Sequence, residues 1–268
     1  MHPMLNIAVR AARRAGDIIL RSVNRVQGIN VDHKGHNDYV SEIDRQAEAA
    51  IIDTLRTSFP DHSVLAEESG RHGDNEYLWI IDPLDGTTNF LHGYPQFAVS
   101  IALQHKGRLE QGVIYDPMRQ ELFTASRGQG ALLNDRRIRV SKQRDLKGAL
   151  LGTGFPVRDP GQLEAYLDTF RSLFAETSGI RRAGAAALDL AYVACGRLDG
   201  FWELSLKEWD MAAGALLVQE AGGLVGDTLG GSDHLRNGDI VAGNPKVFKE
   251  ILIRLRPLVS PRRVKNKD

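Results

Sequence analysis

The stretch at residues 78–90 constrains this chain more than any other, because it passes from an apolar run directly into acids and hydroxyls. Its first four residues, Leu-Trp-Ile-Ile, are all apolar and predict a buried strand. Asp82 follows at once, and Pro83 disfavours the helical region for the residue before it. We therefore expect Asp82 to stay extended and to project its carboxylate from the carboxyl end of that strand.

A turn then adds a second carboxylate and several small polar groups. Asp85 comes three residues after Asp82, beyond a turn that Pro83 starts and Gly86 relaxes. Thr87 and the next threonine add two hydroxyls and, with Gly86, backbone N–H groups in a tight bend. Such a group suits a divalent cation and a phosphate. An Asp-Pro or Asp-Gly dipeptide by itself would predict no more than a surface turn.

A second acidic segment follows a short apolar stretch. Residues 63–66 predict a strand, and Glu67-Glu68-Ser69 comes directly after it. Adjacent glutamates by themselves would suggest a solvated loop. Because ligands gather at the carboxyl ends of strands in open α/β folds, we expect both acidic segments to share one site.

Length and composition limit the number of domains, the kinds of partner and the cellular compartment that we expect. The chain has 268 residues, of which 42% are hydrophobic, so it can form one large domain or two closely packed halves. Its formal net charge of zero provides no global attraction for nucleic acid or an anionic membrane. Cys195 is the single cysteine, which excludes an intrachain disulfide and suits a reducing compartment. With no signal peptide or membrane-length apolar run expected, the sequence predicts a cytoplasmic protein.

Periodicity predicts two helices, then an antiparallel sheet, then a half that mixes strands with helices. A polar, charged region at 141–148 is the best boundary, giving an N-terminal α+β half at 1–145 and a C-terminal α/β half at 146–268. The expected helices are at 5–23, 42–58, 163–174, 187–195, 209–221 and 245–255, and the main expected strands at 63–66, 78–81, 97–104, 111–115, 121–125, 149–154 and 201–204.

At every position, residues 79–90 resemble the first signature of the inositol monophosphatase family. Residues 209–214 and 220–223 resemble its second signature, and Glu67-Glu68-Ser69 resembles its acidic segment. Lys34, followed by Asp38 and Asp44, resembles its mobile N-terminal segment, so the matches extend from 34 to 223. Residues 1–13, 116–119 and 201–203 are similar to the bacterial SuhB branch of this family.

The resemblance implies a fold class and an activity. The fold would be α/β (α+β layered), the sugar-phosphatase or inositol monophosphatase fold, with alternating α-β-α-β-α layers. The activity would be hydrolysis of inositol 1-phosphate with two to three Mg²⁺ ions, by a homodimer that lithium inhibits. Transcription antitermination on ribosomal RNA operons, with RNA polymerase and Nus factors, is associated with the SuhB branch.

It also implies site residues. Glu67, Asp82 and the Leu84 carbonyl would hold a first metal, while Asp82, Asp85 and Asp210 would hold a second. Glu67, with Glu68 nearby, would hold a weaker third ion. Thr87, polarised through Asp44, would help to activate the attacking water. Phosphate oxygens would meet the N–H groups of Gly86 and Thr87, and the other substrate contacts would be Lys34, Asp85, Gly184, Ala185, Ala186, Glu203 and Asp210.

The residue chemistry agrees with this interpretation. Oxygen ligands without a histidine or cysteine cluster favour Mg²⁺ over Zn²⁺, and we interpret the eight scattered histidines as surface residues. A cysteine phosphatase would need an arginine six residues after Cys195, where Phe201 stands. The chain also has no P-loop Gly-Lys-Ser/Thr and no Gly-x-Ser-x-Gly elbow.

Two points leave alternatives open. Lys207 stands where the animal enzymes have a histidine near the substrate pocket, which affects inositol selectivity more than hydrolysis. Glu203 and the small 184–186 segment, with no aromatic platform evident, favour a polyhydroxylated ring over a flat base. Fructose 1,6-bisphosphate and 3′-phosphoadenosine 5′-phosphate remain alternative substrates, and a non-catalytic role in a transcription complex remains an alternative function. Any partner protein would bind an outer surface, such as Arg181-Arg182 or the basic tail at 260–268, with direct nucleic-acid binding weak or indirect.

Overall fold

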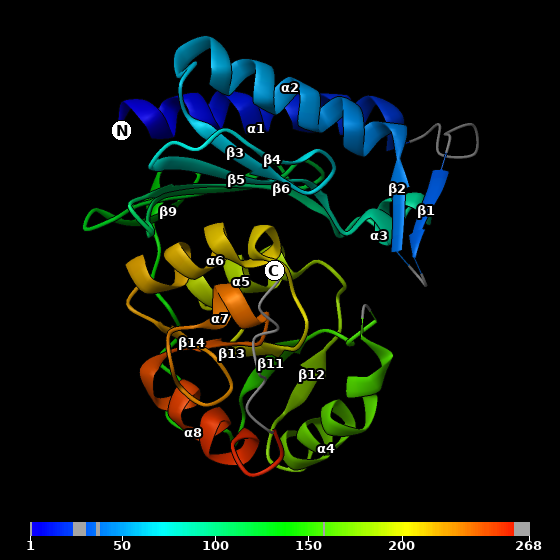
Figure 1. The fold of residues 1–268 in the computed structure, drawn as a ribbon. Helices are drawn as coiled ribbons and strands as arrows, with labels where there is room; N and C mark the ends of the chain where they lie inside the picture. Colours follow the sequence, from blue (N-terminus) through cyan, green and yellow to red (C-terminus); the bar gives the residue numbers. More distant parts are fainter. Residues whose placement is uncertain (1, 24–30, 36–37, 158, 260–268) are drawn as a thin grey trace.

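The computed structural model describes residues 2–23, 31–35, 38–157 and 159–259, which form five alternating layers of helices and sheets (Figure 1). Two sheets separate three layers of helices, which confirms the predicted α-β-α-β-α arrangement. The outer pair is α1 (Pro3–Ser22) and α2 (Glu42–Ser58), the middle pair is α5 (Ala186–Ala194) and α6 (Glu208–Glu220), and the other outer pair is α4 (Leu163–Phe174) and α8 (Pro245–Leu255).

Helices α1 and α2 pack on one face of the larger sheet through narrow apolar faces. Small side chains such as Ala8 and Ala12 are buried on α1, and Ile43 and Ile51 are buried on α2. Ser41 caps α2, and the Asp44 carboxylate accepts a hydrogen bond from the Ser41 N–H, which completes a capping box. The cap therefore fixes Asp44 at the end of α2 where the acidic segments converge.

The larger sheet has eight strands, in the order β10-β9-β8-β7-β6-β5-β3-β4. The prediction of a purely antiparallel sheet is wrong, because β3 and β5 pair in parallel. The chain leaves β3 by a tight hairpin into β4 at the sheet edge, and must cross back before it pairs with β3 from the other side. The strands are β3 (Ser63–Ala66), β4 (Gly70–His72), β5 (Tyr77–Asp85), β6 (Ala98–His105), β7 (Arg108–Asp116), β8 (Glu121–Ser126), β9 (Gly130–Leu133) and β10 (Arg136–Arg137).

The smaller sheet has five strands, and the three at 179–181, 224–226 and 240–243 were not predicted. Its strands are β11 (Leu150–Thr153), β12 (Gly179–Arg181), β13 (Gly200–Glu203), β14 (Leu224–Gly226) and β15 (Ile240–Gly243), in the order β12-β11-β13-β15-β14. Strands β11 and β13 are parallel, so their carboxyl ends lie side by side. A short helix, α7 (His234–Asn237), precedes β15.

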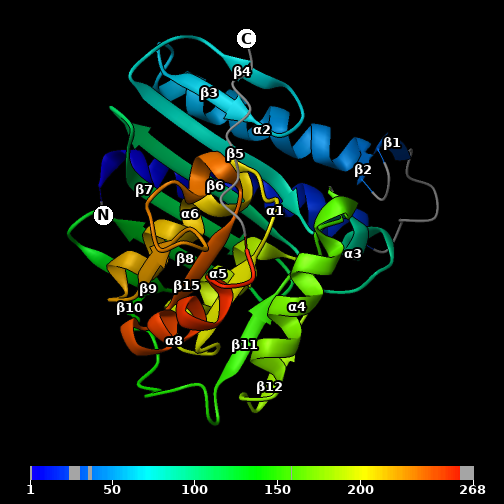
Figure 2. The same cartoon turned by 60° about the horizontal axis from the view of Figure 1, so that its bottom comes forward.

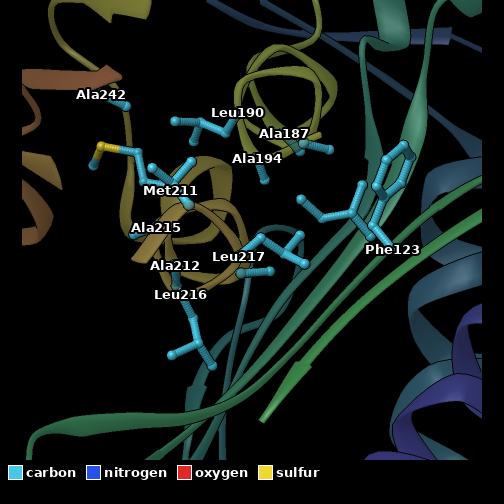
Figure 3. Close-up of a cluster of buried hydrophobic side chains, with 14 of the residues drawn as sticks. Phe123, Ala187, Leu190, Ala194, Met211, Ala212, Ala215, Leu216, Leu217 and Ala242 are labelled. Carbon is cyan, nitrogen blue, oxygen red and sulfur yellow. The ribbon is translucent and has the colours of Figure 1, made fainter. Parts of the chain in front are cut away.

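The middle helices join both halves of the chain into one core. Side chains from α5 and α6, among them Leu190 and Leu217, gather with Phe123 of β8 (Figure 3). The same buried cluster includes Ile80 of β5 and Ala242 of β15. The two predicted halves thus share a hydrophobic core, and their boundary at 145/146 stays a prediction.

One end of the molecule brings together β1 (Val31–Gly35), β2 (Asp38–Ser41) and α3 (Thr87–Leu91) (Figures 1 and 2). The strands β1 and β2 form an antiparallel hairpin. Lys34 belongs to β1, but its side chain lies outside the described part of the structure, as does the basic tail at 260–268. Among the helices that the structure describes, none is long and apolar enough to cross a membrane.

Candidate active site

The first two carboxylates of the candidate site come from the carboxyl end of β5. The strand remains extended through Asp82, and a shift of register separates Asp82 from Asp85. Asp82 Oδ1 accepts a hydrogen bond from the Leu84 N–H at 3.0 Å, so the turn orients its own acid. Asp85 Oδ2 accepts from the Ala187 N–H at 2.7 Å, in the first turn of α5. A helix N-terminus favours a carboxylate at this place.

The third carboxylate comes from the first turn of α6, far away in the sequence. Asp210 Oδ2 accepts a hydrogen bond from the Lys207 N–H at 2.7 Å. Oxygens of Asp82, Asp85 and Asp210 lie within 4.8 Å of one another, and the three residues are only 1%, 9% and 3% exposed. Within the described residues, this cluster offers carboxylate oxygens and neither ring nitrogen nor sulfur. Buried acids this close require a compensating positive charge, and their hard oxygens fit Mg²⁺.

A buried hydroxyl–carboxylate pair lies beside the acids. Thr87 Oγ1 is 2.8 Å from Asp44 Oδ1 and 3.0 Å from the Leu84 carbonyl oxygen. Asp44 is fully buried, and burial raises its pKa, while hydrogen bonds from Ser41 and Thr87 act in the opposite direction. The predicted pairing of Thr87 with Asp44 is therefore present as geometry; its catalytic role stays a prediction.

The three aspartates and Thr87 line a cavity of about 320 Å³, whereas Asp44 contacts Thr87 but is not among the described lining residues. Of the predicted residues, the structure brings the following to its wall: Glu67, Asp82, Leu84, Asp85, Gly86, Thr87, Gly184, Ala186, Glu203 and Asp210. Ala185 is buried next to the wall, at 1% exposure. Gly86 has a positive φ of 93°, and an added Cβ would come within 2.8 Å of the Gln96 carbonyl oxygen, so only glycine fits this turn.

Two of the predicted residues lie apart from this cavity. Glu68 lines a separate cavity on the outer side of α2 with Arg45 and Asp53. The Lys207 side chain is exposed and is not among the described residues of the wall, because the N-cap position of α6 directs only its backbone toward Asp210. The influence of Lys207 on selectivity stays a prediction.

Two further acidic residues, Glu203 at the cavity wall and Asp189 on α5, have raised pKa values. Burial raises the pKa of Glu203 well above its usual value, and the charges of Asp189 and Asp210 add to this. Burial and the charge of Asp85 likewise raise the pKa of Asp189, which is 2% exposed. Sequence reasoning missed Asp189, because it interpreted the α5 face as purely apolar.

The wall also contains an aromatic ring that sequence reasoning missed and the side chain of Arg182, which sequence reasoning assigned to an outer surface for a partner protein. Phe155 is 45% exposed, and the Arg182 guanidinium carbon lies 4.8 Å from the centre of its ring. The expectation that no aromatic platform exists here is wrong. Phe155 follows β11 just as Glu203 ends the parallel strand β13, so the rule of strand carboxyl ends would have placed both at one site.

The interpretation of all histidines as surface residues is wrong for His234. His92 is exposed, as expected, although it also lines the cavity immediately after α3. His234 is 6% exposed, and burial lowers its pKa. Neither residue belongs to a histidine pattern that the sequence alone would reveal.

Comparisons with known proteins all point to the same protein family. The model of the inositol monophosphatase family matches residues 1–259. A Pseudomonas aeruginosa protein described as Nus factor SuhB is 60% identical over 267 residues, covering 97% of this chain and 98% of its own length. The crystal structure of extragenic suppressor protein suhB from Bartonella henselae superposes with a TM-score of 0.93 at 50% identity, over 95% of this chain and 99% of that one. Inositol monophosphatase from Anabaena gives a TM-score of 0.84 at 42% identity, over 96% of each chain.

Proposed function

The chain belongs to the inositol monophosphatase family, and on that basis we propose that it hydrolyses phosphate monoesters with Mg²⁺, inositol 1-phosphate among them. One observation carries the proposal: three buried carboxylates meet within 4.8 Å at the wall of a cavity that also contains Thr87. A purely structural role would leave three mutually repelling acids without a reason to be buried together.

The donor set fits two ions better than one. Asp82 and Asp85 come from β5 and Asp210 from α6, while Glu67 and the Leu84 carbonyl lie on the same wall. In this proposal Glu67, Asp82 and Leu84 hold one Mg²⁺, and Asp82, Asp85 and Asp210 hold another. A third ion near Glu67 and Glu68 is less well supported, because Glu68 faces another cavity. Bound Mg²⁺ would neutralise phosphate charge and make a water nucleophilic.

The side chains of the protein orient that water and the phosphate. A Thr87 hydroxyl that donates to Asp44 or to the Leu84 carbonyl can accept a hydrogen bond from water and aim it at phosphorus. Asp44 is held by Ser41, so the Thr87 rotamer is set before substrate arrives. The N–H groups of Gly86 and Thr87, at the turn into α3, are the proposed phosphate donors.

The leaving group would occupy the side of the cavity between Glu203 and Arg182. Glu203, Asp85 and the backbone of the 184–186 segment offer acceptors and donors for ring hydroxyls. Phe155 adds an apolar face that a sugar ring or a flat base can contact. The cavity therefore supports inositol 1-phosphate without excluding a nucleotide.

A substrate panel tests the proposal. Purified protein with Mg²⁺ would receive inositol 1-phosphate, fructose 1,6-bisphosphate and 3′-phosphoadenosine 5′-phosphate at equal concentrations, and phosphate release would be measured. We expect the highest kcat/KM for inositol 1-phosphate. A higher value for one of the others would assign a different substrate, and no Mg²⁺-dependent release from any would overturn the phosphatase.

A second role is favoured by the relatives described as Nus factors. We propose that this chain also takes part in a transcription antitermination complex. The catalytic groups line one concave cavity, so a macromolecular partner would use an outer surface instead. The formal net charge of zero favours a protein partner over unaided RNA binding.

The two roles should be separable. Asp82→Asn should fail in the phosphatase assay and still complement a strain that lacks the regulatory function. If this variant is abundant and folded but does not complement, product formation is the signal, and the binding role is refuted.

A further inference from the structure

One buried side chain on α2 forms hydrogen bonds with the backbone of the hairpin loop that carries Glu67. Residues 67–69 connect β3 to β4, and Ala66 pairs with Gly70 across the loop. The Glu67 N–H donates to the Ile81 carbonyl at 3.1 Å, which continues the ladder to β5. The next two N–H groups, of Glu68 and Ser69, donate to the Glu48 carboxylate at 2.8 and 2.9 Å.

The position of Glu48 makes this contact specific. Glu48 is 3% exposed on α2, one helical turn after Asp44. A carboxylate buried to this degree requires strong donors, and charge-assisted bonds to both oxygens provide them. Strand β4 has three residues and lies at the edge of the sheet, so the sheet constrains the loop only from the β3 side. Glu48 supplies the constraint on the other side.

We propose that Glu48 is a positioning residue for the metal site: it holds the 67–69 loop so that the Glu67 carboxylate faces the three aspartates. This inference rests on the proposed function. One face of α2 then sets two parts of the site, since Asp44 holds the Thr87 hydroxyl and Glu48 holds the loop of Glu67. Residues that orient a metal ligand typically change metal affinity or activity ten- to a hundredfold when they are replaced.

The chain provides a matched control for the purely structural explanation. Glu220, at the end of α6, makes the same pair of contacts to another loop, accepting from the Gly128 and Gly130 N–H groups at 2.8 Å each. That loop lies between β8 and β9 and does not contribute to the described wall of the cavity. Glu220→Gln therefore removes an equivalent loop contact away from the acids.

The test uses the full chain and calorimetric titration with Mg²⁺ alone. Glu48→Gln keeps the side-chain size, but its amide nitrogen cannot accept from an N–H group. We expect Glu48→Gln to bind Mg²⁺ about tenfold to a hundredfold more weakly than wild type. Glu220→Gln should stay within about twofold of wild type, because its loop holds no proposed ligand. In phosphatase assays, excess Mg²⁺ should restore most of the kcat of Glu48→Gln, which a general folding defect would not allow.

Two further measurements protect the test against a variant that does not fold. Glu48→Asp keeps the charge but shortens the reach, so it should also weaken Mg²⁺ binding. In the wild type, Mg²⁺ should slow hydrogen exchange at the Glu68 and Ser69 amides more than at Gly128 and Gly130.

The outcomes separate the two proposals. Unchanged Mg²⁺ affinity in Glu48→Gln, equal weakening in Glu220→Gln, or exchange that Mg²⁺ slows equally in both loops would overturn the role of Glu48 alone. Tight Mg²⁺ binding that depends on Glu48 but supports no hydrolysis would overturn the proposed function and leave the positioning role. A wild type that binds no Mg²⁺ would overturn both.

Discussion

Replacing Asp82 by asparagine is the most direct test of the proposed metal site. Asp82 is the acid that both proposed ions share, and it is 1% exposed. Asparagine keeps an oxygen for the Leu84 N–H, which Asp82 Oδ1 now accepts at 3.0 Å, so the turn should survive. The change therefore removes charge and one ligand oxygen with little loss of shape.

The expected effect of Asp82→Asn on stability follows from the distances between the carboxylate oxygens. Two carboxylate charges 4.8 Å apart repel by about 3.5 kcal/mol at an effective dielectric constant of about 20. Asp82 has two such neighbours at or within that distance, so in the metal-free protein its charge opposes folding by about 7 kcal/mol or more before relaxation. Removing the charge should leave the metal-free protein as stable as wild type or more stable. With Mg²⁺ and substrate, loss of the shared ligand should lower kcat/KM at least about a hundredfold, which corresponds to about 2.7 kcal/mol.

Two assays together test this reasoning. Thermal unfolding in a chelator should give an equal or higher Tm for Asp82→Asn, and phosphate release at saturating Mg²⁺ should show the kinetic loss. A variant with near-normal hydrolysis would refute the assignment of the site. A Tm far below wild type in the chelator would refute the claim that these acids repel one another in the absence of metal.

Three further changes test other parts of the site. Thr87→Val removes the hydroxyl that contacts Asp44, and should lower kcat about a hundredfold or more with little change in Mg²⁺ affinity, whereas Thr87→Ser should retain most of the rate in steady-state kinetics. Phe155→Ala should lower kcat/KM about fivefold or more for 3′-phosphoadenosine 5′-phosphate relative to inositol 1-phosphate, because stacking on a base is worth about 1–3 kcal/mol; an unchanged ratio would exclude preferential stacking of the base on Phe155. Asp189 has a raised pKa in the folded state, so its contribution to stability is present below the usual carboxyl pKa and is lost as pH rises through the raised pKa. Asp189→Asn should therefore gain Tm over metal-free wild type as pH increases from about 4 to 8, and a constant difference across that range would contradict the buried charge.

The parts of the fold that were predictable are those with long periodic patterns. Apolar spacing predicted both helices of the first layer, and the predicted bounds of the second, 42–58, agree with α2. The parallel pairing of β3 with β5 was not predictable, because strand direction depends on how the chain crosses between them. Short strands such as β12 and β14 carry too few residues for an alternation to be recognised.

The residues of the site also fall into those that the sequence could predict and those that it could not. Asp82, Asp85 and Thr87 are close in sequence, so a single motif could place them at one strand end. Their convergence with Asp210 was available only through resemblance to a family, since no local rule connects the first turn of α6 to β5. Arg182 was interpreted as part of an outer surface, and Phe155 was missed because it stands next to residues that were interpreted for another purpose. Glu48 was missed because a glutamate on a helix with mixed faces looks like any solvated acid until its two donors are seen.

The arrangement also explains why a divalent cation should hold the halves of this chain together. Asp82 and Asp85 come from the larger sheet, Asp210 comes from α6, and the Ala187 N–H that holds Asp85 comes from α5. The apolar cluster between the sheet and these helices favours their association, while the three buried acids at its margin oppose it. A cation that binds only the assembled acids would make their contribution to this association favourable. At a cation concentration of a hundred times its Kd, binding would stabilise the fold by about 2.7 kcal/mol. In the proposed metal site, the same charges would thus make Mg²⁺ binding part of the stability of the fold.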